Sequence, residues 1–426
     1  MPDRRITPPI KDPVELNLQL KPYEHFSLDN GVPVYTINAG AQDVVQVELV
    51  FYAGNWFEQN KSVAAATNFL LKNGTSKRTA FQINEDFEYY GAYCNRACYS
   101  ETAVVNVSAL SKQLPYLLPV IKEMITAAIF PEEELKIYKQ NSKQRLSVSL
   151  QKSDFVAARL SDAYVYGQEH PYGKYTNAED IDALDTDMLK QYYLQYYLNG
   201  HCVIFVSGKP PDDLKEQLNG AFGKLTLSKP TFTVNPISVS VATEKKYRII
   251  NDPKGVQGSI RLIRPFPNRH HPDFMKVMVL NTLFGGFFGS RLMSNIREDK
   301  GYTYGIHSYV QNHLQQSAWL ISTEAGKDVC EATITEVYKE MQLLREELVN
   351  EEELMLVRNY LMGTILGDLD GPFQIMGRWK NLLLNNLDES YFYQSVNTIK
   401  TISAQELREL AKKYLVPEDF YELVVI

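Results

Sequence analysis

The sequence predicts an α+β fold of two homologous domains, each an antiparallel sheet with helices packed on one face. Three observations predict it. The chain has 426 residues, too many for one ordinary hydrophobic core, so two domains of about 200 residues are expected. Each half mixes strand-like and helix-like runs, which is the pattern of a sheet covered by a helical layer. The order of these runs begins again in the second half, which indicates a duplicated domain.

Internal repeats support the duplication. Three segments recur in the same order, with offsets of 217, 219 and 217 residues (339 − 122, 352 − 133 and 414 − 197): Lys122-Glu123-Met124 as Lys339-Glu340-Met341, Glu133-Glu134-Leu135 as Glu352-Glu353-Leu354, and Tyr197-Leu198 as Tyr414-Leu415. A nearly constant offset is typical of two copies of one unit. We therefore predict domains over residues 1–225 and 244–426, with a linker over 226–243, where Pro and Ser interrupt the periodicity.

The first half opens with residues 1–22, which proline punctuates and which we predict to be an extended arm. Asn30-Gly31 predicts a hairpin over Phe26–Ile37. Pro131 and the three glutamates after it favour a helix start, because acidic side chains stabilise the positive end of the helix dipole. The other predicted elements are strands at Val44–Ala53, Ala103–Leu110 and His201–Val206, and helices at Val63–Asn73, Phe81–Gly91, Leu114–Ile129, Pro131–Val148, Phe155–Gly167 and Thr186–Leu198.

The second half is predicted to repeat this plan. Asn350 is a favoured N-cap, and the acidic residues behind it predict a helix over Glu351–Leu366. The other predicted elements are strands at Tyr247–Ile250, Ser259–Arg264, Trp319–Glu324 and Phe420–Ile426, and helices at Asp273–Phe284, Val329–Leu344 and Ala404–Tyr414.

Composition narrows the class of protein. Hydrophobic residues make up 44% and charged residues 22%, and the net charge of −7 argues against a nucleic-acid partner. No apolar run approaches the length of a membrane-spanning helix, and the N-terminus has no apolar signal core, so we expect a cytoplasmic protein with no membrane partner. Cys94 and Cys98 share one side of a predicted strand, but no further ligands lie nearby, so we interpret the four cysteines as buried free thiols.

The chain is organised around Leu280–Tyr309. Gly285, Gly286 and Gly289 allow a sharp turn or a close backbone approach. After the turn, Tyr302, Tyr304, Ile306 and Ser308 alternate as in a strand. Arg297 and Tyr304 thus stand on either side of a helix end and a strand start, which predicts a cation and a phenol in one cleft. A surface cap is the alternative role for this arginine.

Several segments, taken in order, resemble the pitrilysin/insulysin zinc peptidases and the mitochondrial-processing-peptidase-like proteins. They are Asn30-Gly31, Ala53-Gly54 with Glu58, Ala65–Thr75, Gly91–Asn95, Tyr166-Gly167 before His170-Pro171-Tyr172-Gly173, and Leu283–Tyr304. The resemblance covers both halves and implies the duplicated metallopeptidase fold.

Active members of this family carry His-x-x-Glu-His on a helix, with a further Glu on a later helix. Two His four residues apart bind Zn²⁺ from one helix face, and the Glu between them takes a proton from the metal-bound water. Aligned on Asn73-Gly74-Thr75, these positions fall on Ala65, Asn68 and Phe69, and the later Glu falls near Ser149. We therefore predict no catalytic residue, no metal and no cofactor in this chain.

The second-half motif is retained. The resemblance implies that Arg297 and Tyr304 bind the substrate peptide backbone and donate to the developing oxyanion, beside a cleft-lining loop of Gly285, Gly286, Gly289 and Ser290. It further implies a heterodimer, in which a homologous subunit with the zinc motif supplies the metal and both chains enclose unstructured peptides. The alternative is a stand-alone scaffold or peptide-binding homodimer with no peptidase role.

Other candidates give weaker signals. His270-His271 point in different directions in any regular structure, and the segment is loop-like. His170 stands in a Pro/Gly turn, which favours a structural role, and His307 and His313 have no identifiable partner. No Lys-Ser/Thr follows Gly285–Gly289, so these glycines do not form a phosphate loop.

Overall fold

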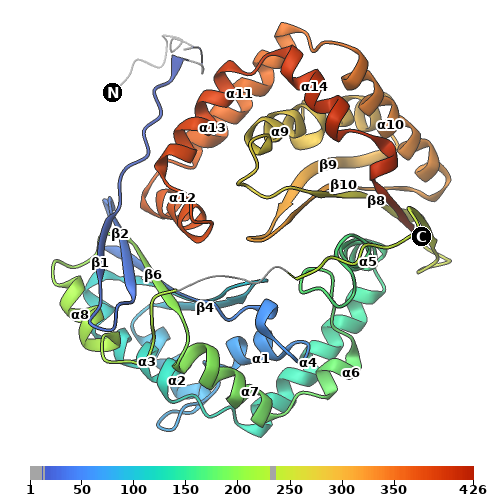
Figure 1. The fold of residues 1–426 in the computed structure, drawn as a ribbon. Helices are drawn as coiled ribbons and strands as arrows, with labels where there is room; N and C mark the ends of the chain where they lie inside the picture. The colour runs from blue at the N-terminus through green and yellow to red at the C-terminus, as the bar shows by residue number, and fades with distance from the viewer. Residues whose placement is uncertain (1–11, 13–14, 231–236) are drawn as a thin grey trace, which may run out of the picture.

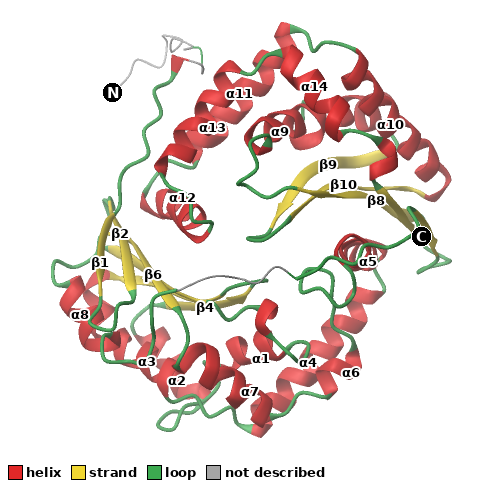
Figure 2. Ribbon diagram, viewed as in Figure 1, coloured by secondary structure: helices red, strands yellow, loops and turns green. Residues whose placement is uncertain are grey.

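The computed structural model describes residue 12, residues 15–230 and residues 237–426. Figure 1 shows two halves whose sheets face the middle of the molecule, and Figure 2 shows most helices on the outside of both halves. The predicted α+β fold in two similar halves is confirmed. Most of the predicted arm (residues 1–11, 13 and 14) and part of the predicted linker (231–236) lie outside the described residues.

The first half contains a six-stranded sheet in the order β1-β2-β6-β3-β5-β4. All neighbouring strands are antiparallel except β2 and β6, so the sheet is mixed rather than purely antiparallel. The Asn30-Gly31 hairpin joins β1 to β2 as predicted. The strands are β1 Glu24–Ser27, β2 Pro33–Asn38, β3 Val44–Phe51, β4 Tyr93–Cys98, β5 Ala103–Leu110 and β6 Cys202–Gly208.

Helices of the first half cover one face of this sheet, over a core of alternating strand residues such as Val45, Val47 and Leu49. Each predicted helix is present, and two short ones, α6 and α8, were not predicted. The helices are α1 Val63–Leu70, α2 Ala80–Tyr89, α3 Leu114–Thr126, α4 Glu132–Leu150, α5 Ser153–Tyr166, α6 Ala178–Asp182, α7 Thr186–Tyr193, continued by the π-helical turn Leu194–Leu198, and α8 Leu214–Phe222.

The second half contains a five-stranded sheet in the order β7-β11-β8-β10-β9. It is also mixed, because β7 and β11 run parallel while the other pairs are antiparallel. Strand β9 is an edge of this sheet. The strands are β7 Lys246–Ile249, β8 Gln257–Phe266, β9 Thr303–Asn312, β10 Ser317–Gly326 and β11 Tyr421–Val425.

The helices of the second half include two that were not predicted, α12 and α13. Asn350 caps α11 by accepting a 2.8 Å hydrogen bond from the Glu353 backbone NH, as its sequence position indicated. Among the described residues, no helix is both long enough and apolar enough to cross a membrane. The helices are α9 Phe274–Asn281, α10 Cys330–Glu346, α11 Glu351–Gly367, α12 Pro372–Leu384, α13 Glu389–Thr401 and α14 Ala404–Tyr414, with π-helical turns η5 Thr282–Gly286 and η6 Met293–Asp299.

Each half also covers the inner face of the sheet in the other half. Helix α12 packs on β2 and β6, where Phe205 and Val203 belong to the same apolar core as Trp379 of α12. Helix α5 packs on β8 and β11 in return, where Ala157 meets Leu423. Both helices lie between the two sheets in Figure 1. The two sheets are therefore buried on both faces over part of their area, which joins the halves firmly.

The N-terminal arm ties the halves together a second time. Leu18 and Leu20 are buried in the core of the second half, although β1 and β2 that follow belong to the first. Trp379 donates a 2.8 Å hydrogen bond from its indole nitrogen to the Lys21 carbonyl. Lys400 donates a 2.7 Å hydrogen bond to the Leu16 carbonyl. Residues 16–22 of the arm are thus extended, as predicted, and anchored along α12 and α13, after a short 3-10 turn at Glu15.

The internal repeat is visible in matched polar contacts. In the first half, the Arg78 guanidinium donates to the buried Glu123 carboxylate. In the second half, the Asn295 amide donates a 2.7 Å hydrogen bond to the buried Glu340 carboxylate. Donors and acceptors are separated by the same 217 positions (295 − 78 and 340 − 123). Equivalent turns are therefore held to equivalent helices in both halves.

Candidate functional site

Helix α1 contains Ala65, Asn68 and Phe69, the three residues expected at zinc-motif positions. Ala65 and Phe69 lie four residues apart on its more accessible face, whereas Asn68 is buried. The Asn68 amide donates a 3.4 Å hydrogen bond to the Val104 carbonyl of β5. A neutral amide in this position cannot accept a proton from water as a carboxylate does. The helix is in place, but its side chains lack metal-binding chemistry.

Phe69 is engaged by its neighbours. The residue is 40% exposed. Its ring packs against the ring of Tyr138 on α4, with the ring centroids 5.3 Å apart. The Arg96 guanidinium of β4 lies 4.9 Å from the Phe69 centroid and donates to the Phe69 carbonyl. A phenol ring and a cation thus pack against the Phe69 side chain on this face of α1.

Helix α4 packs on α1 and contacts this face through Tyr138. Tyr138, which contacts Phe69, is 11 residues before Ser149, so the two lie about 16 Å apart along the helix axis. The Tyr138 side chain in turn interacts with Ser142, one helical turn further along α4. Burial raises the pKa of Tyr138, which keeps its phenol neutral.

Two further groups near α1 could be considered as metal ligands. Burial, reinforced by the charge of Glu58, raises the pKa of Cys98 to about 12, so the thiol stays protonated at neutral pH. The Glu58 carboxylate lies 3.1 Å from the Lys174 ammonium and accepts a 3.2 Å hydrogen bond from the Ala64 NH. Zinc needs deprotonated donors free to bind it, and these residues do not fit that requirement. Within the described part of the chain, no three His, Cys, Asp or Glu side chains form a metal-binding group.

Arg297 and Tyr304 occupy successive elements of the second half. Arg297 lies in the π-helical turn η6, where its guanidinium is 4.6 Å from the Phe288 ring centroid and 3.9 Å from Glu298. π-Helical turns are frequent at functional sites. The chain then reverses at Gly301, whose φ of +66° favours glycine, and enters β9. Both side chains are accessible, although no hydrogen bond joins them among the described contacts.

A β-bulge explains the exposure of Tyr304. Thr303 pairs with Ala325 and Ile306 pairs with Thr323, so Tyr304 and Gly305 oppose a single residue of β10. The predicted alternation is interrupted here: Ile306 is buried, whereas Tyr304 is 90% exposed. The bulge directs the phenol to solvent at an unpaired sheet edge.

The four residues of the predicted cleft-lining loop differ in how deeply they are buried. Gly285 is buried, and a methyl group there would come within 2.7 Å of the Ser308 Cβ, so glycine is needed for close packing on β9. Ser290 is also buried. Gly286 packs near the Asn281 carbonyl. Gly289 alone of the four lines a hollow, of about 740 Å³, beside Leu356 of α11.

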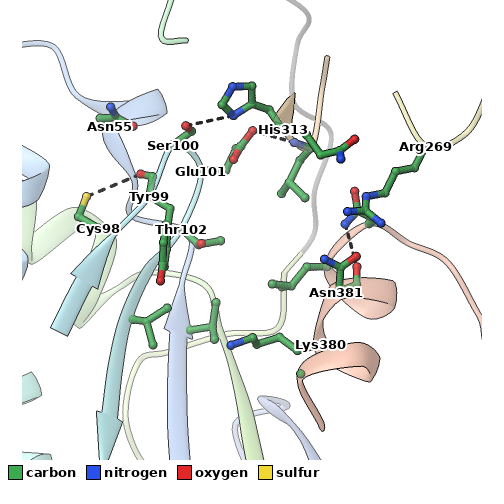
Figure 3. A pocket seen from close by; sticks show the side chains of 17 residues that line it. Asn55, Cys98, Tyr99, Ser100, Glu101, Thr102, Arg269, His313, Lys380 and Asn381 are labelled. Carbon is green, nitrogen blue, oxygen red and sulfur yellow. Dashed lines mark hydrogen bonds between the residues drawn. The ribbon is translucent and has the colours of Figure 1, made fainter. Parts of the chain in front are cut away.

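A second cavity, of about 600 Å³, lies between the halves and was not predicted (Figure 3). The turn between β9 and β10 meets the turn between β4 and β5 there, and the Leu314 NH donates a 3.0 Å hydrogen bond to Glu101. His313 stacks on Tyr172 with ring centroids 3.9 Å apart, and burial lowers the pKa of His313 to about 4. His170, by contrast, is buried in its turn and accepts a hydrogen bond from the Tyr172 NH. No sequence signal could join residues more than 200 positions apart.

Comparisons with known proteins identify the family. The family model "Insulinase (Peptidase family M16)" matches residues 33–171, and "Peptidase M16 inactive domain" matches residues 183–361. The chain is 23% identical over 412 residues to the "Uncharacterized zinc protease YmxG" of Bacillus subtilis, covering 93% of this chain and 96% of that protein. It is also 23% identical over 414 residues to "Mitochondrial-processing peptidase subunit beta" of Bos taurus, covering 91% and 81%.

Solved structures share the fold. The peptidase M16 inactive domain from Pseudomonas fluorescens superposes with a TM-score of 0.85 at 22% identity, covering 95% of this chain and 98% of that one. A chain of "Complex III2 from Candida albicans" gives a TM-score of 0.74 at 16% identity, covering 94% and 95%. The chain therefore belongs to the insulinase (M16) family of peptidases.

Proposed function

We propose that this chain is a non-catalytic subunit of a two-chain zinc peptidase. A homologous partner holds the zinc and performs the chemistry, while this chain forms half of a chamber for unstructured peptides. The observation that carries the proposal is the filled face of α1, where Phe69 packs between Tyr138 and Arg96. Similarity to the processing-peptidase beta subunit supports an assembly of two unlike chains.

Arg297 and Tyr304 are the residues that we assign to substrate in this assembly. The Arg297 guanidinium carries five NH donors and is held by Phe288, while its polar edge stays accessible. The Tyr304 phenol projects from an edge strand, where an approaching peptide can meet it. Both groups donate to carbonyl oxygen and to a developing oxyanion, which is the contribution that a chain without metal can make to the partner's site.

A second function is favoured by one comparison. The chain of Candida albicans complex III2 shares this fold at a TM-score of 0.74, and that chain is part of a larger complex. The alternative is therefore a scaffold, or a peptide-binding homodimer, with no peptidase role. The two functions differ in whether substitutions at Arg297 and Tyr304 change peptide hydrolysis.

The experiment mixes this chain with a zinc-motif homologue from its own host and follows cleavage of a quenched fluorescent peptide. We expect activity to rise at least tenfold over either chain alone. Arg297→Ala and Tyr304→Phe should then each lower kcat/KM by about tenfold or more, as loss of an oxyanion donor does. Arg345→Ala, on α10, is the matched control. If neither substitution changes the activity of the mixture, the role assigned to Arg297 and Tyr304 is rejected and the scaffold function is favoured.

A further inference from the structure

Arg269 lines the cavity between the halves without a carboxylate partner. It lies in the loop between β8 and α9, and Figure 3 shows its side chain near the end of α12 that carries Asn381. The guanidinium interacts with the Tyr391 hydroxyl, and its carbon lies 5.9 Å from the Phe274 ring centroid. Neither neighbour carries a negative charge that could balance it.

Other partly buried cations in the second half differ from Arg269. Lys380, which lines the same cavity, lies 2.7 Å from the Glu48 carboxylate. Arg291 forms a forked pair with Glu353, with distances of 2.7 and 2.9 Å. Among the ion pairs of the described residues, none includes Arg269. Because a guanidinium stays charged at neutral pH, Arg269 brings an unbalanced positive charge into a mostly buried position.

Neutral polar groups form the cavity wall beside Arg269, while on its other side Arg269 borders a smaller hollow lined by Asp388 and Tyr391. Asn381 and Asn385 of the α12 end lie on the same wall of the cavity, with the Asn385 amide donating a 2.7 Å hydrogen bond to the Asn381 carbonyl. The carboxylate at the opposite wall, Glu101, is engaged by the Tyr172 hydroxyl and the Leu314 NH. The volume of about 600 Å³ is that of a small-molecule site, and such sites are frequent at domain interfaces.

We propose that this cavity binds a small ligand with a carboxylate group, and that the Arg269 guanidinium is its cationic partner. Arginine binds carboxylate through two parallel NH donors, and here the contact would supply the missing counter-charge. The carboxylate comes either from the C-terminus of a short peptide or from a small dicarboxylic acid. The site lies within one chain, so it does not depend on a partner subunit or on the proposed peptidase assembly.

The test is isothermal titration of the purified full chain at pH 7 with three probes: trialanine, trialanine amide and succinate. We expect trialanine to bind at least tenfold more tightly than its amide, which lacks the carboxylate charge. Arg269→Met should weaken trialanine binding at least tenfold, and Arg269→Lys, which keeps the charge but not the fork, should weaken it less. Arg408→Met on α14 should bind as the wild type does.

Succinate distinguishes the two sources. Binding of trialanine alone assigns the site to peptide C-termini, and tighter binding of succinate assigns it to small diacids. The proposal is overturned if the wild type binds trialanine and its amide equally, or if no probe binds at about 10 mM. It is also overturned if Arg269→Met, shown by its thermal unfolding to be folded, binds trialanine as the wild type does. The comparison of acid and amide needs no variant.

Discussion

The Phe69 ring packs on the Tyr138 ring with centroids 5.3 Å apart, and the Arg96 guanidinium lies over the same ring at 4.9 Å. These residues come from α1, α4 and β4. The α1 face that carries Phe69 therefore joins three elements by aromatic and cation–π contacts. Its contribution is to the stability of the first half.

We predict that Phe69→Ala lowers the free energy of unfolding by about 1–2 kcal/mol, through loss of one aromatic pair and one cation–π contact. Urea unfolding followed by circular dichroism measures the change. Phe81→Ala is the matched control, because Phe81 is 73% exposed on α2 and should change the free energy by less than about 0.5 kcal/mol. Equal effects of the two substitutions would contradict a structural role for Phe69.

Lys174→Met should destabilise the chain more strongly, by about 3–5 kcal/mol at pH 7, because it leaves the Glu58 carboxylate buried without its cation. Burial already raises the pKa of Glu58, and Lys174 opposes that rise. A carboxyl whose folded pKa is raised contributes stability below its unfolded pKa and loses it as the pH rises through the folded value. The variant should therefore recover stability as the pH falls toward 5.

The control for Lys174 is Lys136→Met, which removes an ammonium 3.4 Å from Glu133 in an exposed pair on α4. An exposed pair of this kind contributes less than about 1 kcal/mol. Unfolding free energies at pH 5 and pH 7 test both variants. A deficit in Lys174→Met that does not shrink at pH 5 would show that Glu58 is not the cause.

Local signals in the sequence predicted the elements well. The cap at Asn350 and the acidic start after Pro131 depend on neighbouring residues, so both helix starts could be read directly. The fold class followed from the repeated order of elements. The composition of α1 was equally local, because Ala65, Asn68 and Phe69 differ from the zinc motif whatever the tertiary structure.

The remaining features depend on contacts between distant residues. Helix α12 was not predicted, and it packs on a sheet more than 160 positions earlier in the chain, around Phe205. The register of α4 against α1 depends on a tertiary contact, the Phe69 ring on the Tyr138 ring, which no local signal in the sequence could give. The exposure of Tyr304 comes from a bulge that pairing with β10 creates. Arg269 could not be predicted as a binding residue, because the cavity that it lines is formed only when the two halves pack together.

The interface between the halves should make stability depend on pH. Burial raises the pKa of Asp162, on α5, to about 7. This folded pKa exceeds that of an unfolded aspartate. The contribution of Asp162 to the free energy of unfolding is therefore present below about pH 4 and is lost as the pH rises through 7. Asp162→Asn should thus be more stable than the wild type at pH 8, by roughly 1–3 kcal/mol, and equal to it near pH 5.

Urea unfolding at pH 5 and pH 8 measures the difference between Asp162→Asn and the wild type. Asp187→Asn is the control, because its side chain is 83% exposed at the start of α7 and should show no difference that depends on pH. A pH-independent difference for Asp162→Asn would mean that Asp162 stays ionised across this range.

Asn295 anchors the π-helical turn that also carries Arg297. Asn295 lies two residues before Arg297 in η6 and donates to Glu340 at 2.7 Å and to Glu336 at 2.9 Å. Asn295→Ala should cost about 1–3 kcal/mol of stability, because the buried Glu340 carboxylate loses its donor. If the proposed assembly is correct, the loosened turn should also lower the kcat of the mixed enzyme.

Asn295→Asp provides the sharper comparison, since it keeps the shape of the side chain but sets a third carboxylate against Glu336 and Glu340. Like charges in one partly buried site raise each other's pKa, so this variant should be the less stable of the two at pH 7 and should recover at pH 5. Asn84→Ala is the control, because its amide bonds only to the backbone of its own helix at Ala80. If the Asn295→Asp variant is as stable as the wild type at pH 7, other contacts hold η6 in place. The contact with the Phe288 ring would then be what positions Arg297.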